Sequence, residues 1–527
     1  MRKLLPAALF FLFVCPFAQA QNTGIGIAIP TNRLHVFAVS NPLRLEGLTS
    51  GTNTDSLLTA DATGVVRRRT VASVLSGGGW GLAGNAATNI NTQFIGTTDQ
   101  VSLAFRTFNQ RSGFIDFDST KRNNSFGNRA MNVTITGNGN NAFGYQAMRS
   151  LSSGINNVAM GDSAGFTLTT GTDNIFLGSD AGKGVTIASQ NIAIGSKVLG
   201  TDGAGSNNIG IGFRSLESEF ASDNIAIGTL ALNKSIVGTN SIAVGSNALT
   251  NFTGTAYAMA LGVDALSALT TGNENIAYGY RAGYTLTTQL QNTLLGNFAL
   301  GNIQAANAAN YNTMVGHNAG GVMNGGSNNT AVGWGAGATV ITSGNSTYIG
   351  YNADVAVGVT TLTNASAFGY ATTVSANNQI RVGNAAVSSI GGQTGWTTVS
   401  DERVKMNVQE NVPGLDFITK LRPVTYNYNL PMIDQIIKPK ISTDISNTSN
   451  TTTRFSGFLA QEVLRTATEA GYDFSGVDKP QNDRSMYGLR YAEFVVPLVK
   501  AVQELNAIVA SQQIKINELE TLLIKKK

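Results

Sequence analysis

A glycine preceded by a bulky or branched apolar residue recurs fifteen times in the middle of this 527-residue chain. These glycines stand, mostly at steps of 17 residues, at positions 144, 161, 178, 195, 212, 228, 245, 262, 279, 296, 316, 333, 350, 369 and 383. Proline is absent from Leu43 to Val412, as a long stacked β structure requires, because proline cannot donate a ladder hydrogen bond. A fixed period of this length predicts repeating units that bury their apolar faces only against their neighbours.

Within each repeat the residues alternate over a short span. With the recurring glycine as position 0, position −1 is always large or branched, position −3 is mostly Val, Ile or Thr, and position −2 is usually Ala, as in Asn191-Ile192-Ala193-Ile194-Gly195. This alternation predicts a strand whose −3 and −1 side chains share one face. Asn stands at −4 in ten of the fifteen copies, and Asn and Gly favour tight turns because both tolerate left-handed backbone angles. We expect coils of two short strands and two turns, stacked as a β-roll or solenoid rod over residues 137–390.

The composition of the chain changes at Ser400. Residues 400–527 hold 31 of the 66 charged residues, whereas 55 of the 60 glycines precede Ser400. We therefore expect a linker at 391–399, a compact α/β unit at 400–497 and a terminal helix at 498–527. The expected elements of this unit are helices at 415–421, 461–469 and from Phe494 onward, strands at 424–428 and 455–459, and a polar insertion at 440–453.

The terminal helix carries an apolar seam with steps of four and three. The seam consists of Leu498, Val502, Leu505, Val509, Gln512, Ile516, Leu519 and Leu523. Such a heptad predicts a coiled coil between copies of the chain, although a helix packed on its own domain is the alternative. Valine and isoleucine at one core position with leucine at the other would by themselves favour two strands, and Gln512 would set the register.

The first twenty residues resemble a secretory signal, with a basic start, an apolar run and a small-x-small cleavage site at Ala18-Gln19-Ala20. The single cysteine, Cys15, lies inside this run, so the mature chain is predicted to lack disulfides and thiolate metal sites. The only histidines are His35 and His317, which excludes a multi-histidine metal centre. The net charge of +4 gives no reason to expect a nucleic-acid partner. We expect a chain without cofactor, metal or integral membrane segment in its mature form, secreted or held at a bacterial cell surface.

The repeat pattern resembles the heads of trimeric autotransporter adhesins, which form a left-handed β-roll. This resemblance implies a mainly β rod, left-handed and trimeric. In the less regular region 21–136, Gly24-Ile25-Gly26-Ile27 and Leu103-Ala104-Phe105-Arg106-Thr107 are similar to short motifs of tail-fibre-like surface proteins. They imply a strand-rich stalk or attachment region.

Three motifs of the C-terminal unit resemble the endosialidase-type intramolecular chaperone domain. They are Ser400-Asp401-Glu402-Arg403-Val404-Lys405, Gly457-Phe458-Leu459-Ala460-Gln461-Glu462-Val463 and Tyr491-Ala492-Glu493-Phe494-Val495-Val496-Pro497-Leu498. That family assists the trimerisation of phage tail spikes and other β-rods and then cuts itself off. The resemblance implies cleavage at the Val399–Ser400 bond by a Ser400/Lys405 dyad, with Asp401 and Arg403 in supporting roles. The chain would then be a single-turnover autoproteolytic serine peptidase.

The spacing of Ser400 and Lys405 is awkward for a pair on one regular element. Five residues place two side chains about 140° apart around a helix and on opposite faces of a strand. The two must therefore meet across a turn, or Ser400 must meet the lysine of another subunit.

We expect a secreted trimeric surface fibre, adhesin-like, whose partners are its own copies and a surface glycan or host receptor. One alternative is a structural fibre with a cap that does not cleave. Another is a glycan-degrading spike, which needs a pair of carboxylates in a groove; the rod's acids, such as Asp162, Asp180 and Asp264, lie beside turn glycines.

Overall fold

The computed structural model describes residues 94–132, 134–201, 205–218, 221–234, 237–255, 257–301, 309–437 and 453–526, together with the backbone of four short strands between residues 23 and 70. The predicted signal at 1–20 with Cys15, the side chain of His35 and most of the insertion at 440–453 lie outside the described residues. The chain divides into two units, residues 1–96 and 97–527.

The first unit contains two small sheets. Strands β1 (Thr23–Ile25) and β2 (Leu34–Val36) pair in parallel, with Thr23 opposite Leu34. Strands β3 (Ser56–Ala60) and β4 (Val66–Thr70) form an antiparallel pair.

The second unit begins with an antiparallel hairpin and continues as a long parallel ladder. Strands β5 (Leu103–Thr107) and β6 (Gln110–Ile115) pair with each other, and β6 pairs with β7 (Asn124–Phe126). From β7 onward neighbouring strands of the ladder are parallel. The solenoid thus begins at Asn124, before the expected boundary at 137.

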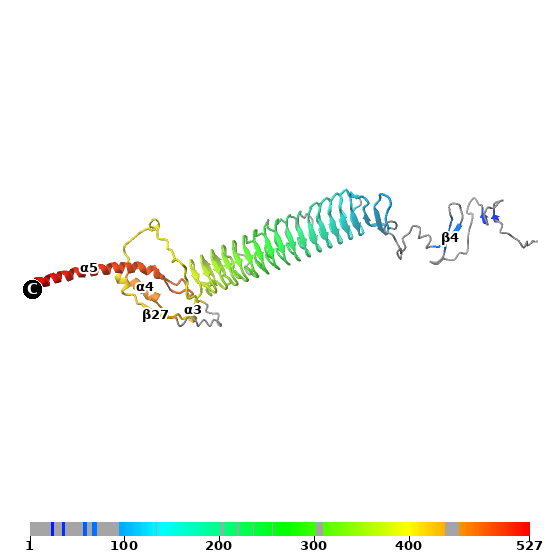
Figure 1. The fold of residues 1–527 in the computed structure, drawn as a ribbon. Coiled ribbons are helices and arrows are strands. Elements are labelled where there is room, and N and C mark those ends of the chain that lie inside the picture. Colours follow the sequence, from blue (N-terminus) through cyan, green and yellow to red (C-terminus); the bar gives the residue numbers. More distant parts are fainter. Residues whose placement is uncertain are drawn as a thin grey trace, which may run out of the picture. The chain divides into compact units, whose positions relative to one another are not determined.

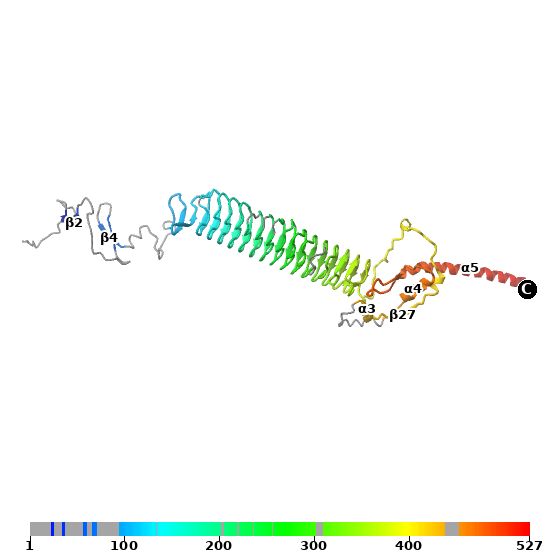
Figure 2. The same ribbon diagram turned by 180° about the vertical axis from the view of Figure 1, so that it is seen from behind.

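The ladder is built from one strand of three residues per coil. After β7 its members are β8 (Asn141–Phe143), β9 (Val158–Met160), β10 (Ile175–Leu177), β11 (Ile192–Ile194), β12 (Ile209–Ile211), β13 (Ile225–Ile227), β14 (Ile242–Val244), β15 (Met259–Leu261), β16 (Ile276–Tyr278), β17 (Thr293–Leu295), β18 (Thr313–Val315), β19 (Thr330–Val332), β21 (Thr347–Ile349), β24 (Ser366–Phe368) and β26 (Ile380–Val382). Figures 1 and 2 show these strands stacked along a rod. A mainly β solenoid over residues 124–382 is therefore confirmed.

The register of the ladder aligns equal positions of successive repeats into columns. Ile192 lies opposite Ile209, Ala193 opposite Gly210, and Ile194 opposite Ile211. The −2 column points into the coil, where Ala193 is fully buried. The −3 and −1 columns point outward, and Ile194 remains 37% exposed. The predicted division of faces is confirmed: the −2 residues from β8 to β24, mostly alanine but including Phe176 and Tyr348, are buried inside the coil, and the −3 and −1 side chains lie on the outer face.

The glycines at position 0 form a column that only glycine can occupy. From Gly144 to Gly350 their φ angles lie between +125° and +142°, as at Gly228 (+137°), a region that residues other than glycine rarely adopt. A Cβ built at Gly228 would stand 2.5 Å from the carbonyl oxygen of Gly245 in the next coil. Close stacking of the coils therefore requires the repeated glycine.

The asparagines at −4 have a different role from the predicted one. They do not sit in left-handed turns but form a buried ladder inside the rod: the backbone N–H of Asn191 donates to Oδ1 of Asn174 (3.0 Å), and the N–H of Asn208 donates to Oδ1 of Asn191 (3.0 Å). The left-handed residue is instead at −5, for example Gln190 with φ +61°. An amide that donates and accepts satisfies buried backbone groups of the adjacent coil, whereas an apolar side chain would leave them unpaired.

The expected second strand in each coil is wrong for most of the described rod. A second strand appears only near its C-terminal end, where β20 (Thr342–Gly344) pairs with β23 (Thr361–Thr363) and β22 (Asp354–Val355) pairs with β25 (Thr373–Val374). In the other coils the return path is made of turns, and hydrogen bonds still join it to the next coil, as from Thr169 N to Thr186 O (2.8 Å). The repeat period constrains the stacking of coils but not how regular each side of a coil is.

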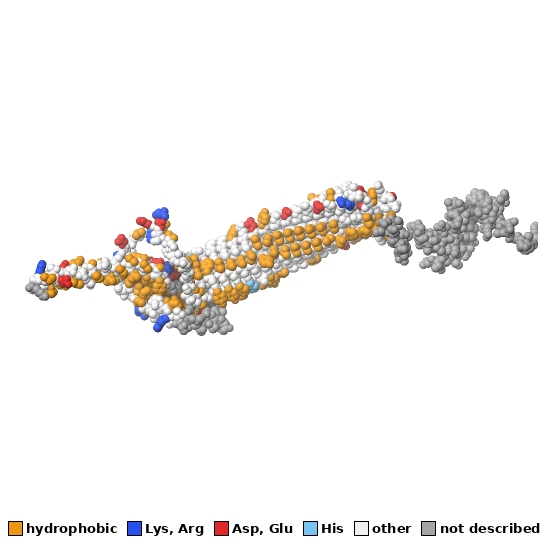
Figure 3. All heavy atoms as spheres, viewed as in Figure 1, with side chains coloured by type: hydrophobic (Ala, Val, Ile, Leu, Met, Phe, Trp, Pro, Cys, Tyr) orange, Lys and Arg blue, Asp and Glu red, His pale blue; other side chains and the backbone are white. Residues whose placement is uncertain are grey.

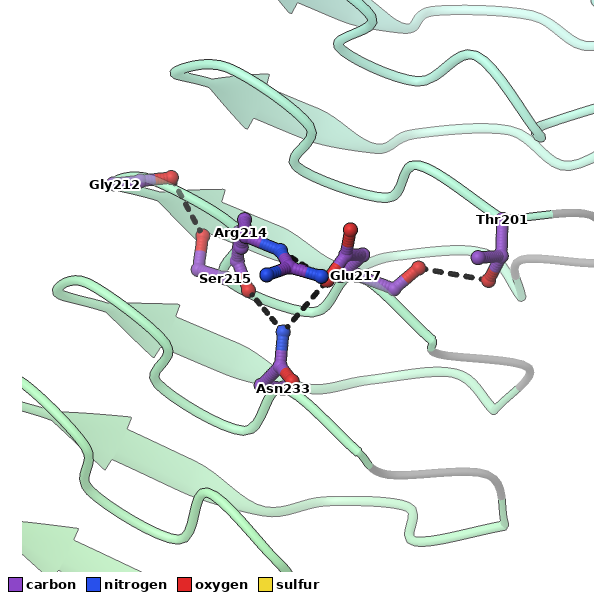
Figure 4. A network of polar contacts seen from close by, with 6 residues as sticks. All are labelled: Thr201, Gly212, Arg214, Ser215, Glu217 and Asn233. Carbon is purple, nitrogen blue, oxygen red and sulfur yellow. Dashed lines mark hydrogen bonds and ion pairs between the residues drawn. The ribbon is translucent and has the colours of Figure 1, made fainter.

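Polar side chains on the rod also link one coil to the next. Figure 4 shows Glu217 paired with Arg214 at 2.7 Å while Asn233 of the following coil donates to Glu217 Oε2 (3.1 Å) and to the Arg214 carbonyl (2.8 Å). Thr201 Oγ1 of the preceding coil donates to the Glu217 carbonyl (2.7 Å). These charged residues therefore have local partners in the stack.

The C-terminal unit is a small α/β domain that ends in a long helix. Its elements are η1 (Glu402–Val404), α2 (Leu415–Ile418), β27 (Val424–Tyr426), α3 (Leu430–Ile437), β28 (Phe455–Gly457), α4 (Ala460–Glu469), β29 (Val477–Asp478), β30 (Gly488–Leu489), η3 (Tyr491–Phe494) and α5 (Val495–Lys526). Strands β27 and β28 pair antiparallel, as do β29 and β30. The core contains Phe417, Val463, Phe474 and Phe494. Helix α3 was not predicted; its Pro431 lies in the first turn, where proline is tolerated.

Helix α5 leaves its apolar seam exposed. Val502 is 60%, Leu505 50% and Leu519 60% exposed, so most of the helix does not pack on its own domain. By length and composition alone, the helical stretch Tyr491–Lys526 would also qualify as a membrane span. Its charged residues and heptad spacing are more typical of a coiled coil.

Candidate active site

The segment between the rod and the C-terminal domain is exposed along most of its length. Trp396 is 92%, Val399 82% and Met406 86% exposed. Between Val399 and Met406 lies the short 3-10 helix η1, with Asp401 as its N-cap and Lys405 as its C-cap. The turn thus follows directly after the Val399–Ser400 bond, where cleavage was predicted.

The turn brings Ser400 and Lys405 together within one chain. Lys405 Nζ donates a hydrogen bond of 2.8 Å to Ser400 Oγ. The N–H of Lys405 donates to the Glu402 carbonyl (3.1 Å), which closes the turn. Of the two arrangements that the spacing allowed, the structure contains the meeting across a turn.

Asp401 and Arg403 hold this turn in shape. The backbone N–H of Arg403 donates to Asp401 Oδ1 at 2.9 Å, and its guanidinium binds both carboxylate oxygens, with Nη2 at 2.6 Å from Oδ2. These hydrogen bonds from Arg403 lower the pKa of Asp401, and Asp401 in turn raises the pKa of Arg403. Asp401 and Arg403 therefore stabilise the turn, and the hydrogen bonds described for their side chains do not involve Ser400 Oγ.

The other two motifs meet inside the C-terminal domain, away from this pair. The N–H of Phe458 donates to the Tyr491 hydroxyl (3.0 Å), and the rings of Phe458 and Phe494 are stacked at 5.3 Å. The N–H of Leu415 donates a hydrogen bond of 2.7 Å to Glu504 Oε2 of α5. These motifs thus build the domain's framework.

Beside this framework is a tyrosine-lined pocket of about 710 Å³ that sequence analysis missed. Tyr426, Tyr428, Tyr487 and Tyr491 contribute to its wall. The hydroxyl contact between Tyr426 and Tyr428 (3.3 Å), followed by burial, raises the pKa of Tyr426 to about 12. Neither Ser400 nor Lys405 lines it. Its lining combines β27 and α3 with the stretches 458–461 and 480–491. Residues of the second and third motifs, such as Phe458 and Tyr491, therefore contribute to the pocket, but their spacing along the chain does not show that they meet.

No group of three or more His, Cys, Asp or Glu residues within the described parts of the chain is arranged to hold a metal ion.

Comparison with known families gives one match within the chain. Residues 400–472 match the family model described as "Chaperone of endosialidase". A comparison with curated proteins gives no match. The matched segment begins at Ser400 and includes η1, the β27–β28 sheet and α4. The chain thus carries a chaperone-of-endosialidase domain that follows a β-solenoid rod.

Proposed function

We propose that this chain is a secreted, trimeric surface fibre whose C-terminal domain assists assembly and then cuts itself from the rod at Val399–Ser400. The observation that carries the proposal is the 2.8 Å contact between Lys405 Nζ and Ser400 Oγ, at the first residue of the matched domain. A serine hydroxyl needs a neighbouring base to become a nucleophile, and the contact with Lys405 Nζ supports this lysine as that base.

The proposed reaction begins at the carbonyl carbon of Val399. Ser400 Oγ attacks this carbon while unprotonated Lys405 takes the hydroxyl proton. The C–N bond to Ser400 then breaks, and Lys405 returns the proton to the departing amine. The resulting Val399 ester is hydrolysed by water, which leaves a carboxylate on Val399 and restores the Ser400 hydroxyl. The products are the fragments 21–399 and 400–527.

Assembly is the proposed trigger for cleavage. A lysine acts as a base only after desolvation or nearby positive charge favours its neutral form, but the segment around Ser400 is exposed in the single chain. Val404 is 67% and Val408 77% exposed, so apolar side chains close to Ser400 and Lys405 are available to pack against another copy of the chain. Packing of neighbouring copies around this segment would exclude water and activate Lys405.

Two apolar surfaces support self-association. Along the rod, outward residues of the ladder remain exposed, including Met160 (52%) and Tyr278 (60%), and Figure 3 shows rows of apolar side chains running along it. The seam of α5 is exposed in the same way. Rows of this extent are typical of interaction surfaces. The number of copies, three, comes from the resemblance to trimeric β-rods.

The glycan-degrading alternative finds less support on the rod. Asp180 pairs with Lys183 at 2.9 Å and Asp264 with Arg281 at 3.4 Å. Both aspartates have left-handed backbone angles, with φ of +56° and +59°, as expected of turn residues. A pair of carboxylates facing a common groove, which glycoside hydrolysis needs, does not follow from these contacts.

The test is the intact mass of purified protein. Wild-type chain should yield the two fragments, whereas Ser400→Ala and Lys405→Ala should stay whole. Lys405→Arg should also stay whole, because it keeps the charge but cannot serve as a base at neutral pH. Thr398→Ala, which removes a neighbouring hydroxyl, should cleave normally. An assembled wild-type trimer that remains uncut would instead support a cap that only trimerises.

A further inference from the structure

The outer face of the rod changes composition about halfway along. In the −3 column the residues from β9 to β16 are Val158, Ile175, Ile192, Ile209, Ile225, Ile242, Met259 and Ile276. The next members are Thr293, Thr313, Thr330, Thr347 and Ser366, stacked in register, followed by Ile380. An apolar column thus gives way to hydroxyl side chains between β16 and β17.

The column at position +1, just after each glycine, changes in the opposite sense. In the earlier coils five of the eight +1 residues are polar, namely Asp162, Ser179, Ser196, Thr229 and Ser246, and the other three are Tyr145, Phe213 and Val263. From Gly279 onward it contains Tyr280, His317, Trp334, Tyr351 and Tyr370, and Asn297 is followed by Phe298. Aromatic residues at +1, or at +2 in the case of Phe298, therefore begin at Tyr280, in the last coil before the −3 residue becomes polar, and continue through the coils where −3 is polar.

These aromatic side chains form one continuous row. The rings of Trp334 and Tyr351 lie 5.0 Å apart at an interplanar angle of 11°, and those of Tyr351 and Tyr370 lie 5.5 Å apart at 13°. His317 stacks on Trp334 at 5.8 Å, and Phe298 links His317 to Tyr280 through edge contacts. Stacking covers the ring faces within the row and leaves the outer edges accessible, so Trp334 is still 48% and Tyr370 65% exposed.

We propose that this aromatic row, residues Tyr280, Phe298, His317, Trp334, Tyr351 and Tyr370, is a contact surface for a second copy of this chain. Copies touch through the −3 and −1 columns from β9 to β16 and through the −1 and +1 columns from β17 onward. The inference rests on the proposed trimer and adds which residues meet in each half. The proposal is based on the shift of apolar residues from the −3 column to the +1 column along the rod. If both columns faced only solvent, the loss of isoleucine at −3 would not be expected to coincide with the gain of aromatic residues at +1.

The area of the row is sufficient for this role. A fully buried aromatic side chain contributes roughly 150–250 Å². Because members of the row such as Trp334 (48%) and Tyr351 (47%) are about half-exposed, the six rings still present on the order of 500 Å² that a partner could cover. With the adjoining −1 column the surface approaches the roughly 800 Å² per partner of a stable interface. An apolar stripe that drifts across a straight element makes partners wind around each other, as heptad drift does in coiled coils. We therefore infer that the rods wind rather than lie strictly parallel.

Four single-cysteine variants in a Cys15→Ser background test the exchange directly. Ile192→Cys and Ser196→Cys sample the −3 and +1 columns of one early coil, and Thr347→Cys and Tyr351→Cys sample those of one late coil. Each purified assembly is treated with a short bismaleimide and run on a denaturing gel, and its size is measured by sedimentation. Cross-linked dimers are expected for Ile192→Cys and Tyr351→Cys, and monomers for the other two.

Cross-linking of Thr347→Cys but not Tyr351→Cys would overturn the proposal, as would cross-linking of all four. If the protein sediments as a trimer but none of the four variants cross-links, the proposed contact surface is wrong and the proposed trimer stands. If the protein sediments as a monomer, the proposed trimer itself is wrong. A second measurement avoids substitution in the row. In a Trp80→Phe/Trp396→Phe protein, acrylamide should quench Trp334 weakly in the assembly and strongly after dissociation; strong quenching in both states contradicts a buried row.

Discussion

Replacing Gly228 by alanine should destabilise the rod more than a single methyl group would suggest. Gly228 has a φ of +137°, and its N–H donates to the Ile211 carbonyl of the previous coil at 2.7 Å. An added Cβ would stand 2.5 Å from the oxygen and 2.6 Å from the carbon of the Gly245 carbonyl in the next coil. The methyl group thus meets rigid backbone that cannot move without opening the stack.

The magnitude follows from two separate costs. Holding a residue other than glycine in such a sparsely populated backbone conformation costs about 1–3 kcal/mol. Forcing extra volume into a close-packed contact costs about 1–3 kcal/mol more. We expect a loss of about 4 kcal/mol, which corresponds to roughly a 10³-fold change in the unfolding equilibrium constant. Because coil stabilities depend on nearest neighbours, the loss should be felt on both sides of the substitution.

The assay is urea unfolding followed by far-UV circular dichroism, with Gly344→Ala as the matched control. Gly344 also lies in the rod, but a Cβ there would meet only the Ser327 carbonyl oxygen, at 3.9 Å. Alanine at this site should be neutral or stabilising by up to about 1 kcal/mol, since it restricts the unfolded chain. Equal midpoints for Gly228→Ala and wild type would refute the steric reasoning. Equal losses for both variants would show that any added methyl group weakens the rod.

Further predictions concern the buried ladder, the domain and the chaperone role. Asn191→Ala should lower the rod's unfolding free energy by about 1–3 kcal/mol, because the Asn208 N–H loses its 3.0 Å acceptor; an unchanged urea midpoint contradicts this. The 2.6 Å contact with Arg422 lowers the pKa of Glu462. The ion pair therefore stabilises the folded domain at pH values above the ordinary pKa of a glutamate, and this stabilisation is lost as the pH falls through the lowered pKa. Glu462→Gln should therefore melt below wild type at pH 7 and match it in strong acid. Deleting residues 400–527 from the gene should give insoluble rod, and a soluble trimer from that deletion would end the chaperone proposal.

The sequence alone determined that the rod is a stack of coils and which strand forms its continuous ladder. Stacking places equal positions of successive repeats in register, so a two-residue alternation beside a recurring glycine is enough to identify the strand and its two faces. The change in charge and glycine content at Ser400 also located the start of the next domain, because composition is a property of the local sequence. Helix α5 was also predictable, because its heptad seam depends only on spacing along one element.

Other features were decided by the tertiary structure. The role of Asn191 depends on the amide lying inside the coil, which its spacing alone does not specify, and the number of strands per coil depends on the return path. The contact of Lys405 with Ser400 arises from the backbone angles of a three-residue turn held by Asp401 and Arg403. The tyrosine-lined pocket joins segments far apart in the chain. Local pattern fixes which residues share a face, whereas distances between residues on different faces depend on how the whole chain turns and packs.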